Sequence, residues 1–141
     1  MSSKSIRFFS EDTDFTLKGK DKTRTWVIKV CKEENHSIRD LNIVFCSDKY
    51  LLSMNQEYLQ HDTFTDIITF DNSENPDQLE GDIFISIDRV RENANKFQTD
   101  VSTELLRVII HGVLHLMGYK DKSEKDKLAM RKKEDACLSL F

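Results

Sequence analysis

One stretch of the sequence, residues 108–118, constrains the fold and chemistry of this chain more than any other. It reads Val-Ile-Ile-His-Gly-Val-Leu-His-Leu-Met-Gly, an apolar run interrupted by His111 and His115 and ended by Gly118. The run predicts a buried helix that stops at the glycine. Residues four apart on a helix share a face, with Cβ atoms roughly 5–6 Å apart, so both imidazoles can reach one metal ion. A shared metal would also satisfy two polar rings that are costly to bury alone.

A third ligand is needed for a catalytic zinc site, and Asp121 is the candidate. It lies six residues after His115, just past the turn predicted at Gly118, so its carboxylate can fold back towards the helix face. Two alternatives stay open at this point. The histidines can lie at the edge of the apolar stripe and contact water or backbone, and Asp121 can be a solvated acid among neighbouring lysines.

The rest of the chain predicts an α+β fold, with about four strands in a mixed sheet and roughly five helices packed on it. The Phe70-to-Ile83 connection is short enough for an antiparallel hairpin, and the strand–helix–strand step before it suggests a parallel pair. Strands are expected at 6–9, 41–46, 66–70 and 82–87, and helices at 20–35, 48–59, 88–97, 102–117 and 123–138.

Composition is that of an ordinary globular domain, and 141 residues suffice for one domain spanning 1–141. We find no apolar run long enough to span a bilayer, so we expect a cytoplasmic protein without a membrane partner. Cys31, Cys46 and Cys137 are far apart and form no C-x-x-C pair, which favours reduced, buried thiols. The net charge of −4 means that any affinity for nucleic acid must come from a local cluster of cations.

The histidine helix resembles the signature of the YbeY family of rRNA maturation endoribonucleases, H-G-x-L-H-L-x-G-Y-D-H, whose three histidines bind zinc. Residues 111–119 follow it closely, whereas the last two positions are Lys120 and Asp121. The resemblance therefore implies one Zn²⁺ held by His111, His115 and Asp121. Because aspartate is a harder ligand than histidine, another divalent metal is also compatible with the site.

Two further blocks carry the same resemblance. Residues 54–70 are similar to the family's L-N-x-x-Y/W-R…D-x-P-T-D/N-V-L-S-F, and residues 81–85 to its L-G-D-I-x-I strand. Together the three blocks cover roughly residues 41–121. They imply a zincin-like metal-dependent hydrolase, acting as a single-strand-specific endoribonuclease in 16S rRNA 3′-end maturation and ribosome quality control. The implied partners are ribosomal RNA, the small ribosomal subunit and assembly factors.

The chain also departs from the family. Leu59 replaces the family's arginine, Phe64 replaces a proline, and residues 50–88 contain no Lys or Arg. A phosphate backbone would be repelled by the acids of that stretch, although His61 would supply part of the lost charge when protonated. These departures favour an alternative function, a non-enzymatic ribosome-assembly factor with a structural metal.

No residue stands out as the general base. Asp66 and Asp82 are candidates because each lies at a predicted strand end within a matched block, although turn or cap carboxylates are the alternative.

A metallopeptidase is a third possible function, but Gly112 occupies the position at which zinc proteases carry their catalytic glutamate. Cations for RNA are present in the last helix and just before it, but acids including Glu134 and Asp135 are interleaved with them, which favours a solvated helix face. These cations are Lys120, Lys122, Lys125, Lys127, Arg131, Lys132 and Lys133.

Overall fold

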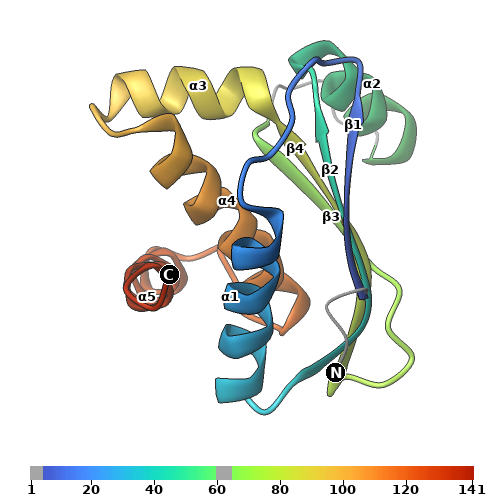
Figure 1. Ribbon diagram of the computed structural model, residues 1–141, viewed down its shortest axis with the longest axis vertical. Coiled ribbons are helices and arrows are strands. Elements are labelled where there is room, and N and C mark those ends of the chain that lie inside the picture. The colour runs from blue at the N-terminus through green and yellow to red at the C-terminus, as the bar shows by residue number, and fades with distance from the viewer. Residues whose placement is uncertain (1–4, 60–64) are drawn as a thin grey trace.

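The computed structural model describes residues 5–59 and 65–141, and in them a four-stranded mixed sheet carries five helices (Figure 1). The α+β expectation is therefore confirmed. The elements are β1 (Ile6–Glu11), α1 (Lys20–Glu33), β2 (Ser37–Cys46), α2 (Asp48–Leu59), β3 (Ile67–Asp71), β4 (Gln78–Ser86), α3 (Ile87–Lys96), α4 (Val101–Leu116) and α5 (Glu124–Leu138).

The strand order is β1-β2-β4-β3, with β1 and β4 parallel to β2. The expected hairpin is confirmed, because β3 pairs antiparallel with β4. The sequence also predicts that the strands before and after α2 form a parallel pair, and this prediction is wrong. Strand β3 does not lie beside β2, because it is at the edge of the sheet and runs antiparallel to β4. The central place belongs to β4, whose alternate residues Leu79, Ile83 and Ile85 are fully buried, whereas the short β3 is mostly half-exposed.

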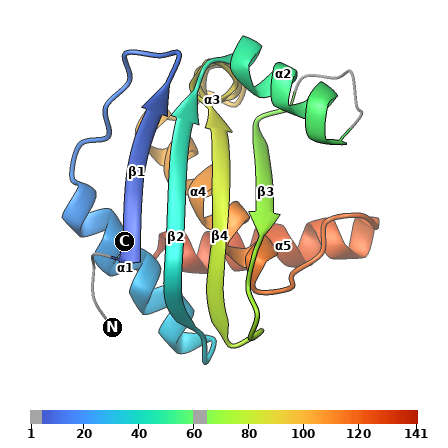
Figure 2. The ribbon, with the colours of Figure 1, turned by 90° about the vertical axis from the view of Figure 1, so that its right-hand side faces the viewer.

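The helices divide between the two faces of the sheet. Helices α1, α4 and α5 lie on one face, and α2 lies at one end of the other (Figures 1 and 2). The main core forms under α4, where Ile109, Val113 and Leu114 are buried against the sheet. A smaller cluster of Cys46, Leu51 and Ile68 joins α2 to the opposite face.

Helix boundaries follow the sequence signals to within a few residues. Helix α4 ends where Gly118 takes a φ of 102°, as the apolar run predicts. Helix α3 begins earlier than expected, because Ser86 rather than Asp88 accepts a hydrogen bond from the Arg89 backbone N–H at 3.2 Å. The capping box of α5 joins Ser123 to Asp126. The three cysteines are buried and unpaired, as expected.

None of the helices in the described residues has the length and apolar character needed to cross a bilayer.

Gly112 lets α4 approach the sheet closely. A Cβ at this position would lie 2.8 Å from Ile67 Cδ1 and 3.0 Å from Ile83 Cγ2. These isoleucines come from β3 and β4, so the glycine sets the depth at which the histidine helix sits on both strands.

The Gly112→Ala substitution is expected to lower the free energy of unfolding by about 1 kcal/mol. The added methyl group overpacks the helix–sheet contact, and this cost outweighs the better helix propensity of alanine. Urea unfolding measures the difference. The matched test is Ile67→Val, which removes the Cδ1 atom in the way, so that the double variant loses less stability than the sum of the two single changes. An alanine variant as stable as the native chain would contradict the close contact.

Candidate metal centre

Three groups on α4 and the turn after it converge on one point. The Nε2 atoms of His111 and His115 lie 3.0 Å apart, and Asp121 Oδ2 lies 3.5 Å from His111 Nε2. One potential ligand atom from each of the three residues lies within 4.8 Å of the others, and all three side chains are half-buried. The helical spacing of four brings the rings together, and the turn at Gly118 returns the carboxylate to the same face. This arrangement could hold a metal ion.

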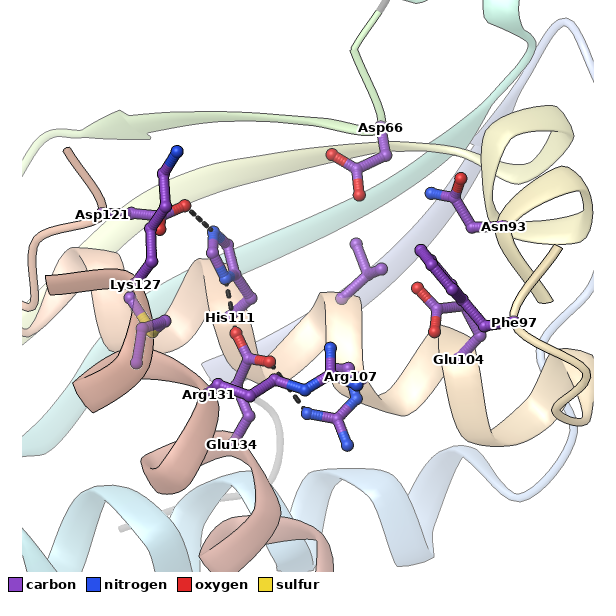
Figure 3. A pocket seen from close by; sticks show the side chains of 12 residues that line it. Asp66, Asn93, Phe97, Glu104, Arg107, His111, Asp121, Lys127, Arg131 and Glu134 are labelled. Carbon is purple, nitrogen blue, oxygen red and sulfur yellow. Dashed lines mark hydrogen bonds and ion pairs between the residues drawn. The ribbon is translucent and has the colours of Figure 1, made fainter. Parts of the chain in front are cut away.

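A buried carboxylate on α5 fixes the orientation of the first ring. Glu134, which is 5% exposed, has Oε2 2.6 Å from His111 Nδ1 (Figure 3). Arg107 supports this acid, with Nη1 3.0 Å from Glu134 Oε1 and Nη2 2.6 Å from Asp135 Oδ1. When Nδ1–H donates to Glu134, the lone pair of His111 Nε2 faces His115 and Asp121. Metal-binding histidines are typically held in this way by a carboxylate on the far nitrogen.

The pKa values of the cluster follow from burial and these charges. Burial alone would lower the pKa of His111, but the hydrogen bond and charge of Glu134 outweigh it and raise that pKa above its ordinary value. Burial alone would raise the pKa of Glu134, but the hydrogen bonds from His111 and Arg107 lower it. Burial and the neighbouring His111 lower the pKa of His115. These opposite shifts favour the neutral form of His115 and the protonated form of His111. A metal ion that binds His111 has to displace its proton.

Glu134 is the residue that the sequence interpretation missed. The mixture of acids and lysines predicts a solvated helix face, and this prediction is wrong for Glu134, which is buried. A signal was present, because Met130, Glu134 and Cys137 recur at spacings of four and three and form the buried side of α5. An acid within such a stripe indicates a buried partner, here the histidine ring.

A hydrogen-bonded cluster holds the turn that carries Asp121. The Tyr119 hydroxyl donates to Glu34 at the end of α1, and Lys133 Nζ of α5 lies 2.7 Å from the same carboxylate. These two bonds lower the pKa of Glu34. The turn is thereby tied to two helices, which fixes the position of the third candidate ligand.

The metal-ligand candidates His111 and Asp121 line a pocket of about 380 Å³, and both acidic and basic side chains contribute to its walls. Asp66 lines it, just before β3, and its backbone carbonyl accepts a hydrogen bond from Ser86 N at 2.9 Å. Burial raises the pKa of Asp66, although the charge of His111 opposes the shift. Lys127 and Arg131 of α5 line the same pocket and are exposed, so part of the cationic run faces the cluster.

The other candidate base, Asp82, lies elsewhere. It is in the middle of β4, and its alternation with Ile83 puts it on the sheet face away from α4. Its carboxylate accepts hydrogen bonds from Asn42 at 2.9 Å and Asn72 at 3.2 Å. The structure therefore places Asp66 in the same pocket as His111 and Asp121, whereas Asp82 lines a different pocket.

Some sequence predictions fall outside the described residues. His61 and Phe64 belong to the segment 60–64, and for Leu59, the last residue of α2, only the backbone is described.

The Glu134→Gln variant is expected to bind metal about tenfold more weakly, because the neutral amide no longer fixes and polarises the His111 ring. Competition with a chromophoric chelator measures the dissociation constant. Asp135→Asn is the matched control, since Asp135 contacts the same arginine but not the histidine. Equal weakening in both variants would mean that Glu134 acts through Arg107 rather than through the ring.

Comparison with known proteins gives consistent similarities along nearly the whole chain. A family model described as Endoribonuclease YbeY matches residues 6–141. The protein of that name from Cytophaga hutchinsonii is 56% identical over 140 residues, covering 99% of this chain and 98% of its own length. The one from Christiangramia forsetii is 50% identical over 136 residues, covering 96% of this chain and 94% of its own. The solution structure of TM1509 from Thermotoga maritima superimposes with a TM-score of 0.69 at 28% identity, over 96% of this chain and 87% of its own.

Proposed function

This chain belongs to the YbeY family of endoribonucleases, and from that premise we propose that it is a metal-dependent enzyme that cleaves single-stranded RNA. The observation that carries the metal dependence is the convergence of His111, His115 and Asp121 within 4.8 Å. Two imidazole nitrogens and one carboxylate oxygen are a donor set that fits a catalytic zinc with an open fourth position. Because one donor is an aspartate, a harder divalent ion is the alternative occupant.

When bound, a divalent ion supplies Lewis-acid chemistry, stabilising negative charge on the phosphoryl oxygens and on the attacking oxygen. The chain's own residues supply the rest. Glu134 holds the His111 ring in the tautomer that leaves Nε2 free to bind. Arg131 and Lys127 attract the phosphate backbone at the pocket wall.

We assign proton transfer to Asp66. Asp66 lines the same pocket as His111, and burial raises its pKa towards the range in which a carboxylate works well as a general base. It would take the proton of the attacking water or hydroxyl and hold it on a carboxylate oxygen. Asp82, on the far face of the sheet, has no part in this step.

For the biological role, we propose 16S rRNA 3′-end maturation and ribosome quality control in the cytoplasm. The partners would be ribosomal RNA, the small subunit and its assembly factors, and residues 1–141 would act as one domain. This follows from the family resemblance together with a pocket whose cations face the candidate metal ligands.

The test is single-turnover cleavage of a single-stranded RNA that carries the 3′ end of 16S rRNA with its extension. We expect rigorously purified protein to cut this RNA, to lose the activity with chelator and to regain it when Zn²⁺ is added, while a duplex of the same sequence stays intact. Cleavage that persists after chelation, or in an Asp121→Ala variant, would contradict a metal-dependent nuclease.

The second candidate is a non-enzymatic assembly factor whose metal only closes the turn after α4. It is favoured by Leu59 in place of the family's arginine and by the acids of residues 50–88. Under this alternative, chelation lowers the unfolding temperature of the protein, and the RNA substrate stays uncut in every condition.

A further inference from the structure

The pocket has a second end, away from the metal cluster, with its own chemistry. Phe97, Glu104 and Asn93 gather there, opposite Asp121 (Figure 3). Phe97 follows the last residue of α3 and is 58% exposed, with Lys96 Nζ 5.7 Å from the centre of its ring. An exposed aromatic face at this place is suited to stacking on a flat ligand.

Glu104 is the second feature of this end. It lies seven residues before His111, two turns along the same face of α4, and is only 8% exposed. Within residues 5–59 and 65–141 its carboxylate forms no hydrogen bond or ion pair. Burial raises its pKa, although attraction to Arg107 opposes the shift. The Glu104 oxygens are not among the fully enclosed polar atoms of the described residues, so the carboxylate is open to the pocket and can accept hydrogen bonds from a ligand there.

A nucleobase meets both requirements, because it offers a flat face for the ring and N–H groups at its edge for the acid. Among the four bases, guanine has two adjacent donors, N1–H and N2–H₂, that match the two oxygens of one carboxylate. Uracil presents a single N3–H between two carbonyl oxygens, which the carboxylate would repel. Lys127 and Arg131 line the same pocket towards the metal-ligand end, Lys127 beside Asp121 (Figure 3), and the phosphate of the same nucleotide would lie against them.

We propose that this end of the pocket binds a guanine base of the RNA substrate, stacked on Phe97 and hydrogen-bonded through its Watson–Crick edge to Glu104. The inference rests on the proposed function, since it names the nucleotide held beside the metal site. It gives the pocket a base preference that the metal ligands alone cannot provide.

The experiment is a titration of the full chain with guanosine and uridine 5′-monophosphates, followed by amide NMR shifts. The native chain is expected to bind the guanosine nucleotide about fivefold or more tightly than the uridine nucleotide. Glu104→Gln should remove most of this preference, because the amide presents only one acceptor. Phe97→Ala should weaken both nucleotides by about fivefold or more, since stacking is insensitive to the base.

Two exposed positions outside the pocket provide matched controls, Phe9→Ala on β1 and Glu33→Gln on α1, and both should bind like the native chain. Equal affinity of the native chain for the two nucleotides would overturn the proposal, as would an unchanged preference in Glu104→Gln. Because the titration requires no cleavage, its result is independent of the chelation test. If the chain binds the guanosine nucleotide selectively but cleaves no RNA, the guanine site is supported and the proposed nuclease function is contradicted.

Discussion

The His115→Ala variant is expected to purify without its metal and to cleave single-stranded RNA on the order of 10²–10⁴-fold more slowly than the native chain, because a catalytic metal contributes several kcal/mol to the transition state. His115 is the better ligand to remove, since its ring contacts His111 within the cluster, whereas His111 also balances the buried Glu134. Loss of His111 would remove one of the two partners of that acid, leaving only Arg107, and would confuse loss of metal with loss of fold. Metal content and single-turnover rates are measured on the same preparation.

His36→Ala is the control for this experiment. His36 lies between α1 and β2, is half-buried like His115, and takes no part in the cluster. It should keep the native metal content and cleavage rate. A His115→Ala protein that still cuts at the native rate would remove the metal from the mechanism.

The Asp66→Asn variant should keep its metal and lose about 10²–10⁴-fold in cleavage rate, the usual contribution of a general base. A base must be deprotonated, so the native rate should fall as the pH drops through the Asp66 pKa, which burial raises above its ordinary value. The variant should lack this acidic limb of the pH profile. The pH dependence of the single-turnover rate measures both effects.

Stability separates this role from a structural one. The pKa of Asp66 is higher in the folded than in the unfolded chain, so ionisation of this carboxyl lowers the stability of the fold as the pH rises through that pKa. The Asp66→Asn variant, which carries no charge there, should therefore be at least as stable as the native chain at neutral pH. Asp82→Asn, on the far face of the sheet, is the matched control and should cleave at the native rate. An Asp66→Asn enzyme with native activity would exclude it as the base.

The sequence was sufficient for the histidine helix and its turn, because their signals are local. The spacing of His111 and His115, the apolar run and Gly118 act within one segment, and the observed helix Val101–Leu116 follows them. Strand order was not accessible in the same way. Either β3 or β4 could lie beside β2, and the strand that buries more apolar surface against the helices takes that place. The amount buried depends on tertiary packing and not on a local sequence signal.

The choice between the two candidate bases shows the same limit. The sequence predicts both Asp66 and Asp82 at strand ends, but β4 begins at Gln78, four residues before Asp82 and earlier than its apolar pattern indicates. Alternation along the longer strand then turns Asp82 away from α4. Glu134 was hidden for a different reason, since it is 23 residues from His111 and only the packing of α5 on α4 joins them.

The proposed cleavage mechanism depends on one divalent ion held by His111, His115 and Asp121. Elemental analysis of the protein purified from its native host, without added metal or affinity tag, tests this directly. One equivalent of zinc or another divalent metal per chain, lost in parallel with RNA cleavage during dialysis against chelator, is the predicted result. A preparation that cleaves RNA at full rate with no stoichiometric metal would contradict it.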